Sequence, residues 1–136
     1  DKIMINVKQF FDALRDQGVS NFSGVPDSLL KNICAYISDN TNPIQHLITA
    51  NEGSAVALAV GQYITTGQPS LVYMQNSGFG NAINPLLSLA DAEVYSVPMI
   101  VMIGWRGEPG IKDEPQHVKQ GAIMEQLLEA CDLPTI

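Results

Sequence analysis

Short apolar runs alternate with amphipathic segments along the whole chain. The apolar runs predict strands at 21–25, 44–50, 70–75 and 98–105. The other segments predict five helices. The first two are at 7–17 and 28–39, the third begins at 52, the fourth follows the third strand and ends at about 94, and the last is at 118–131. This alternation is typical of a parallel sheet with helices on its faces. We therefore expect an α/β fold, a three-layer sandwich, built as one domain over residues 1–136.

The residues at the expected element ends agree with this fold. Asn6 can cap the first helix and Gly18 can end it, since asparagine favours the first position and glycine the position after the last. Residues 76–81 and 106–116 predict loops. The run 98–105 is apolar throughout, so we expect a strand covered by helices on both faces.

Composition and charge indicate which kinds of molecule the chain can bind. Hydrophobic residues make up 46% of the chain and charged residues only 15%, and uncharged surface often meets another protein chain. The net charge of −7 argues against binding to nucleic acid or to an anionic membrane surface. No apolar run is long enough to span a membrane. The chain starts at Asp1 and stops at 133–136, where a further strand could begin, so it reads as part of a longer polypeptide.

The two cysteines, Cys34 and Cys131, match no metal-binding or redox spacing. Their low number and their spacing predict reduced thiols and a cytoplasmic protein.

The unusual residues of the chain gather after the expected strands, where ligands of parallel sheets bind. These segments are 25–28, 50–53, 75–81 and 105–117. Residues 32–105 contain no lysine or arginine, and three cations then follow in or beside the last of these segments: Arg106, Lys112 and Lys119. Such a group can bind an anionic substrate. A solvated surface loop would carry the same residues.

Glu52, Asp27 and His117 are titratable residues within these segments. Glu52 stands at a strand-to-helix junction, where a carboxylate can also simply stabilise the helix start. Asp27 can likewise be a helix cap, and His117 a solvated loop histidine.

Four segments, in this order, carry a resemblance to a known family. They are Gly24-Val25-Pro26-Asp27, Asn51-Glu52-Gly53-Ser54-Ala55, Ser77-Gly78-Phe79-Gly80 with Asn84 and Ala90-Asp91-Ala92, and Ser96-Val97-Pro98 with the apolar strand after it. The chain resembles the pyrimidine-binding domain of thiamine-diphosphate-dependent 2-oxo acid decarboxylases over essentially its whole length. It departs from the family pattern at Phe79, where proline is usual, and by one extra residue before Asn84.

The resemblance implies roles for the candidate residues. Glu52 would bond to the aminopyrimidine of thiamine diphosphate and relay a proton. Asp27 and His117 would assist proton transfer to the carbon that loses carbon dioxide. The residues expected to approach the cofactor besides Glu52 are Asn76, Gly78 and Gly80.

The resemblance also implies missing parts. No metal ligands are expected in this chain, because the family binds Mg²⁺ and the cofactor's diphosphate in its other domain. The implied partners are that domain and further copies of the chain, in a dimer or tetramer.

The segment from Gly104 to Gly121 resembles members of the family that convert 3-phosphonopyruvate to phosphonoacetaldehyde and carbon dioxide. Arg106, Lys112 and Lys119 would then bind the phosphonate. The α subunit of a sulfopyruvate decarboxylase is the alternative within the family. A non-catalytic α/β binding module is the alternative from another class.

Overall fold

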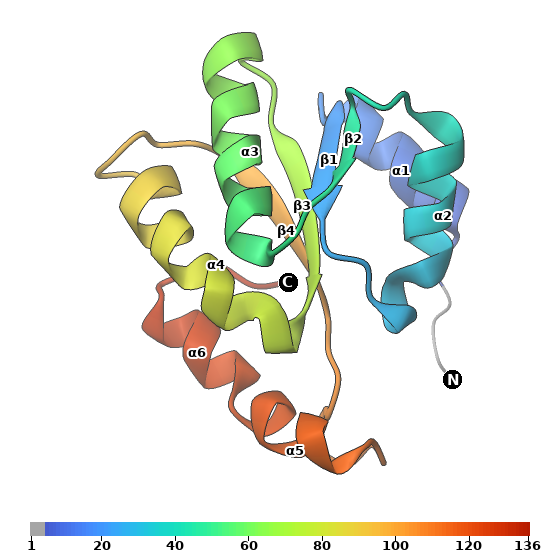
Figure 1. Cartoon of the computed structure of the whole chain (residues 1–136), viewed down its shortest axis with the longest axis vertical. Coiled ribbons are helices and arrows are strands. Elements are labelled where there is room, and N and C mark those ends of the chain that lie inside the picture. The colour runs from blue at the N-terminus through green and yellow to red at the C-terminus, as the bar shows by residue number, and fades with distance from the viewer. Residues whose placement is uncertain (1–4) are drawn as a thin grey trace.

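A four-stranded parallel sheet lies between two layers of helices in the computed structural model, which describes residues 5–136 (Figure 1). The strands are β1 (Asn21–Gly24), β2 (His46–Ile48), β3 (Ser70–Gln75) and β4 (Met99–Gly104), in the order β2-β1-β3-β4. The expected three-layer α/β sandwich is confirmed. The expected domain starts at residue 1, and residues 1–4 lie outside the described residues.

Each face of the sheet has its own helix layer and its own apolar core (Figure 1). Helices α1 (Val7–Asp16) and α2 (Lys31–Asn40) cover one face, and α3 (Glu52–Thr66), α4 (Phe79–Pro85) and α6 (Met124–Ala130) cover the other. Helix α5 (Pro115–Ala122) lies beyond the carboxyl ends of the strands.

Neighbouring residues of β3 serve opposite cores, because side chains alternate across a strand. Leu71 packs with Phe22 against α1 and α2, whereas Val72 and Met74 pack against α3 and α4. Fully burying one such side chain stabilises the fold by about 1.5–3 kcal/mol. The two cores fix the sheet and thereby the strand ends that carry the polar residues.

Asparagine side chains begin two of the helices. Oδ1 of Asn6 accepts a hydrogen bond from Gln9 N at 3.0 Å at the start of α1, as expected from the sequence. Oδ1 of Asn51 accepts from Ser54 N at 2.9 Å, so α3 begins at Glu52. The position of Glu52 as the first residue of a helix is therefore set by its neighbour in the sequence.

Three predicted elements are wrong in detail. Residues 76–81 are not a loop, because a 3₁₀ turn (Asn76–Gly78) leads directly into α4, whose Phe79 is fully buried. Helix α4 then passes into a π-turn (Leu86–Ala90) and ends before 94. The last helix is divided into α5 and α6; near the division, Gly121 uses its carbonyl oxygen to accept from Trp105 Nε1 at 3.0 Å.

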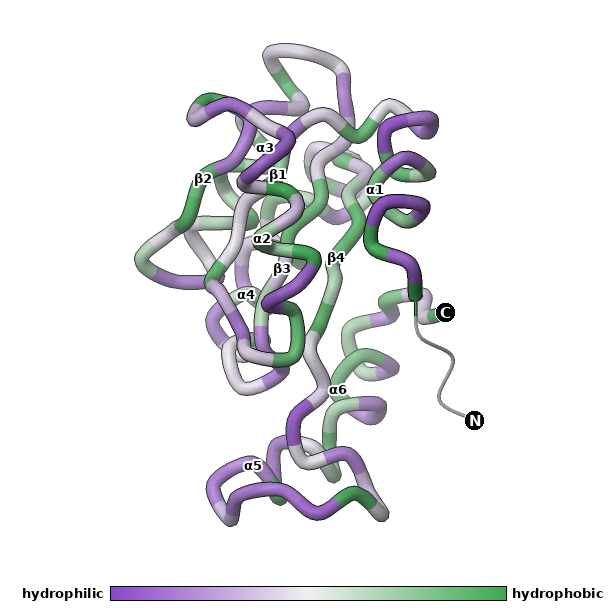
Figure 2. The backbone as a smooth tube through the Cα atoms, turned by 90° about the vertical axis from the view of Figure 1, so that its right-hand side faces the viewer, coloured by the Kyte–Doolittle hydropathy of each residue, from purple (hydrophilic) through white to green (hydrophobic). Residues whose placement is uncertain are grey.

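Strand β4 differs from the fully covered strand that its sequence predicts. Its residues are hydrophobic, as the hydropathy colouring of β4 in Figure 2 shows, but β4 lies at the edge of the sheet and, within residues 5–136, pairs with β3 alone. Ile100 is 41% exposed. An apolar run therefore predicted the strand correctly but not its place in the sheet.

The two cysteines form no disulfide with each other, as the sequence predicts, and the helices are also as short as it predicts. Cys34 and Cys131 are free thiols, and burial raises the pKa of Cys34 to about 11, so this thiol stays protonated and unreactive at neutral pH. In the described part of the chain, no helix combines the length and the apolar character needed to cross a bilayer.

His46 makes the fold sensitive to mild acid. Its Nε2 lies 2.7 Å from the hydroxyl of the buried Tyr73, its Nδ1 lies 3.2 Å from Ser38 Oγ, and burial lowers the pKa of His46. The unfolded chain therefore binds a proton first as the pH falls below 6.5, and stability is lost from there toward the folded pKa. We expect urea melts at pH 7.5 and 5.5 to show a larger loss of stability in wild type than in His46→Gln, and solvent screening should keep the difference small. Equal losses in the two proteins would contradict this role.

Candidate active site

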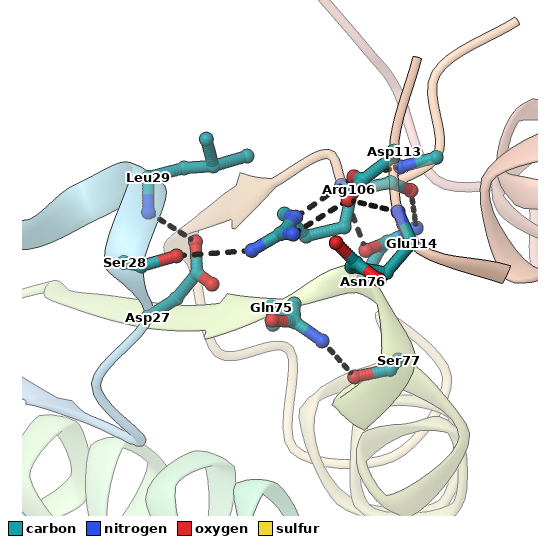
Figure 3. Close-up of polar contacts among 10 residues, drawn as sticks. Asp27, Ser28, Leu29, Gln75, Asn76, Ser77, Arg106, Asp113 and Glu114 are labelled. Atoms are coloured by element: carbon teal, nitrogen blue, oxygen red, sulfur yellow. Dashed lines mark hydrogen bonds and ion pairs between the residues drawn. The ribbon is translucent and has the colours of Figure 1, made fainter. Parts of the chain in front are cut away.

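Polar side chains from three strand ends meet at the carboxyl edge of the sheet (Figure 3). Asp27 follows β1, Asn76 follows β3 and Arg106 follows β4. Glu52 stands at the start of α3, which follows β2. The structure thus brings together at one edge the segments that the sequence singled out.

The Glu52 carboxylate rests on the backbone of Gly78. A Cβ atom on Gly78 would lie 2.0 Å from Glu52 Oε1 and 2.2 Å from its Cδ, so only glycine fits here while the Glu52 side chain keeps this position. The other oxygen, Oε2, accepts a hydrogen bond from Asn81 Nδ2 at 2.9 Å. Glu52 is partly buried, which leaves a carboxylate in a fixed place with a path to a ligand.

Asp27 is a buried carboxylate with one unsatisfied oxygen. The residue is only 7% exposed, and Oδ2 accepts from Leu29 N at 3.0 Å, so Asp27 does cap the turn that starts at Ser28. Oδ1 has no hydrogen-bond partner among residues 5–136. Gly104 leaves the room for this side chain, since a Cβ there would lie 2.2 Å from Oδ2. A buried oxygen without a donor is costly, and a bound group that donates would relieve it.

Arg106 is held by Asp113, a residue that the sequence did not single out. Arg106 Nε and Nη2 donate to the two carboxylate oxygens of Asp113 at 2.8 and 2.5 Å, and Nη1 donates to Ser28 Oγ at 3.1 Å (Figure 3). The paired side chains are 22% and 13% exposed. The guanidinium holds the pKa of Asp113 well below its usual range, so the pair stays charged in mild acid. No local signal marks Asp113, because Glu108 and Glu114 share its loop.

Asn76 joins the end of β3 to the loop after β4. Its Nδ2 donates to the carbonyl oxygen of Arg106 at 2.8 Å, and its Oδ1 accepts from Arg106 N at 3.0 Å. The side chain is 1% exposed. Both ends of the amide are bonded to Arg106, so Asn76 fixes the start of the loop after β4, and its approach to a cofactor stays a prediction.

The remaining candidates lie further along the same segment. His117 is half-buried on α5, and its backbone carbonyl lies under Gly107, where a Cβ would meet it at 2.1 Å. Lys112 and Lys119 are exposed and form no ion pair within residues 5–136. Gly80 is exposed, and a Cβ there would meet nothing within 4 Å.

The site is one connected group. Gly78, beneath Glu52, ends the turn that begins at Asn76; Asn76 holds Arg106, and Arg106 donates to Ser28 beside Asp27. Among the described residues, no cluster of three or more histidine, cysteine or acidic side chains could hold a metal ion. The arrangement offers two fixed carboxylates and a fixed guanidinium at the edge where a ligand would bind.

Removing the Asp113 carboxylate should loosen the loop after β4. We expect Asp113→Asn to be cleaved by trypsin after Arg106 roughly tenfold faster than wild type, because cleavage follows local opening. Glu108→Gln is the matched control, since the Glu108 side chain makes no hydrogen bond within residues 5–136. Equal cleavage rates for the two variants would show that the ion pair does not hold the loop.

The fold and the site define an α/β domain that presents carboxylates at the ligand-binding edge of a parallel sheet. The family model described as "Thiamine pyrophosphate enzyme, N-terminal TPP binding domain" matches residues 6–129, and the chain therefore belongs to this family.

Individual relatives agree. A phosphonopyruvate decarboxylase from Streptomyces viridochromogenes is 39% identical over an alignment of 136 positions, which covers 96% of this chain and 32% of that protein. The sulfopyruvate decarboxylase subunit alpha from Methanocaldococcus jannaschii is 32% identical over 126 residues, 92% of this chain and 71% of that subunit. The solved structure of benzoylformate decarboxylase from Polynucleobacter necessarius matches 76% of this chain and 19% of that chain, with a TM-score of 0.61 and 28% identity. The chain spans about a third of the length of the first of these relatives.

Proposed function

We propose that this chain is the domain that binds the pyrimidine ring of thiamine diphosphate in a decarboxylase of 3-phosphonopyruvate, which releases phosphonoacetaldehyde and carbon dioxide. The observation that carries the proposal is the Glu52 carboxylate, held by Asn81 above a glycine that leaves it room. The likeness to a phosphonopyruvate decarboxylase supports the choice of substrate.

The residues present fit the pyrimidine ring. Glu52 is only partly buried, and the donor bonded to it within residues 5–136, Asn81, contacts Oε2, so Oε1 is available for a hydrogen bond with a ring nitrogen. Glu52 would hold a proton at that nitrogen, which is the general acid–base part of the reaction. When bound, thiamine diphosphate supplies the nucleophilic carbon that attacks the 2-oxo group and the electron sink for decarboxylation.

Asp27 and His117 are proposed to assist the proton transfer that follows the loss of carbon dioxide. Asp27 Oδ1 is buried and lacks a donor within residues 5–136, so it is ready to accept a hydrogen bond from an intervening water. His117, half-buried on α5, is the second candidate for returning a proton to the carbon that has lost carbon dioxide.

Three cations are proposed to meet the phosphonate. Arg106 uses three of the five guanidinium N–H donors on Asp113 and Ser28, so two remain for an anion. Asp113 neutralises much of its charge, and Lys112 and Lys119, which form no ion pair in the described chain, would supply the balance for a dianion. Arginine would fix orientation, and the lysines would act as point charges.

The rest of the enzyme is proposed to come from partner elements. A second domain would bind Mg²⁺ and the diphosphate of the cofactor, and further copies of the chain would complete a dimer or tetramer. The match to an alpha subunit supports the need for a partner domain or subunit. Gly80, exposed and unobstructed, is the place on this chain where the cofactor or such a partner could approach the backbone.

A sulfopyruvate decarboxylase α subunit is the second candidate. The observation in its favour is that the chain covers 71% of such a subunit, compared with 32% of the phosphonopyruvate enzyme. Sulfonate carries one charge less than a fully ionised phosphonate. Loss of one lysine should therefore weaken the binding of sulfopyruvate less than that of phosphonopyruvate.

The test is a comparison of substrates on the assembled enzyme. We would join this chain to its native partner domain, add thiamine diphosphate and Mg²⁺, and measure carbon dioxide release from phosphonopyruvate, sulfopyruvate and pyruvate. The proposal expects phosphonopyruvate to have the highest kcat/KM, by roughly tenfold or more. Preference for sulfopyruvate would favour the second candidate. No carbon dioxide release from any of the three substrates would contradict both decarboxylase proposals and would favour a non-catalytic binding module.

A further inference from the structure

Asn81 is in direct contact with the Glu52 carboxylate. Its Nδ2 donates to Glu52 Oε2 at 2.9 Å, and in the described part of the chain no other group donates to Glu52. The contact joins residues 29 positions apart in the sequence. It leaves Oε1 as the oxygen without a donor, directly over Gly78.

The backbone around Asn81 is fixed although its side chain is exposed. Phe79 and Ala82, on either side of it along α4, are fully buried in the core under α3. A Cβ on Gly53 would lie 2.7 Å from the carbonyl oxygen of Asn81, so the first turns of α3 and α4 touch without a side chain between them. The amide of Asn81 is therefore presented to Glu52 from a rigid position.

We infer that Asn81 is a positioning residue for Glu52. Asn81 holds one oxygen of the Glu52 carboxylate, so that the other oxygen is available to the ring nitrogen of the cofactor. This inference rests on the proposed function. It assigns Asn81 no contact with the substrate.

An amide suits this task better than a charged side chain. A carboxylate can only accept hydrogen bonds when ionised, so its holder must be a donor. Lysine or arginine would add a positive charge that competes with the ring for Glu52, and aspartate would add a second negative charge beside it. Asparagine donates without changing the charge of the site.

The first test removes the amide. In the assembled enzyme, Asn81→Ala should lower kcat roughly tenfold to a hundredfold, with the KM of the 2-oxo acid within about threefold of wild type, as for loss of a hydrogen bond that orients a catalytic group. The dissociation constant of thiamine diphosphate, measured by calorimetry without substrate, should rise several-fold. Asn84→Ala is the control: its side chain accepts from Ser88 Oγ at 3.1 Å on the same segment and makes no contact with Glu52.

The second test adds a charge in place of the amide. Asn81→Asp has nearly the same shape but sets a carboxylate beside Glu52, and two carboxylates in contact share a proton to higher pH. The pH at which cofactor affinity changes should therefore move upward in Asn81→Asp. It should not move in Asn84→Asp, which can still accept from Ser88. A purely structural role for Asn81 would not shift this profile.

The outcomes separate this inference from the proposed function. An active wild-type enzyme in which both Asn81 variants match their Asn84 controls in kcat, cofactor affinity and pH profile overturns the role of Asn81 alone. A wild-type assembly that binds no thiamine diphosphate overturns the proposed function, and this inference with it. Lower kcat and weaker cofactor binding in Asn81→Ala, with the shifted profile in Asn81→Asp, support the inference.

Discussion

Glu52→Gln is expected to lower kcat of the assembled enzyme about a thousandfold, within the range that general acid–base catalysis contributes. Glutamine has nearly the shape of glutamate, so it can still lie over Gly78 and meet Asn81. It cannot exchange a proton with the ring nitrogen. The KM of the 2-oxo acid should stay near the wild-type value, because the substitution touches the proton and not the binding of the acid group. Steady-state release of carbon dioxide measures both constants.

The control is another carboxylate in the first turn of a helix. Glu125 lies in the first turn of α6, and Glu125→Gln removes the same charge from a similar local position. It should leave kcat unchanged. If Glu52→Gln and Glu125→Gln behave alike, Glu52 serves only to stabilise the start of α3.

Gly78→Ala is expected to lower kcat about a hundredfold by displacing Glu52 rather than by removing it. The new Cβ would lie 2.0 Å from Oε1, and all three of the nearest atoms belong to the Glu52 side chain. That side chain is flexible and can swing aside, so the fold should survive while the carboxylate leaves its place. Activity and the melting temperature of the same protein, measured together, test this separation.

Gly80→Ala is the informative comparison for Gly78→Ala. A Cβ on Gly80 meets nothing within 4 Å in the chain, so any loss of activity there reports the approach of a cofactor or a partner chain. A Gly78→Ala enzyme with wild-type kcat would show that catalysis does not need the room that Gly78 leaves for the Glu52 carboxylate. A variant that unfolds would show that the Glu52 side chain has nowhere else to go.

The place of several candidate site residues could be predicted because they lie at strand ends. Asp27 follows a short apolar run and Glu52 follows a helix-capping asparagine, and both patterns are local. Asp113 and Asn81 could not be found in this way, since each acts on a residue that only the fold brings near. Nothing local separates Asp113 from the neighbouring acidic residues.

The fold was predictable to a similar depth. Apolar runs and amphipathic segments gave the parallel α/β sandwich, but the place of β4 in the sheet depends on which strands pair with it. The helical start at Phe79 was missed because glycines on both sides are typical of a loop, whereas burial of the Phe79 ring in the core outweighs that local preference.

The most direct test of the role of Glu52 is the rate at which the assembled enzyme exchanges the thiazolium C2 proton of bound thiamine diphosphate for deuterium, with no substrate present. Wild type should exchange this proton roughly a hundredfold or more faster than Glu52→Gln, because the proposal assigns the proton relay to the Glu52 carboxylate. Equal exchange rates in the two proteins would contradict the role of Glu52.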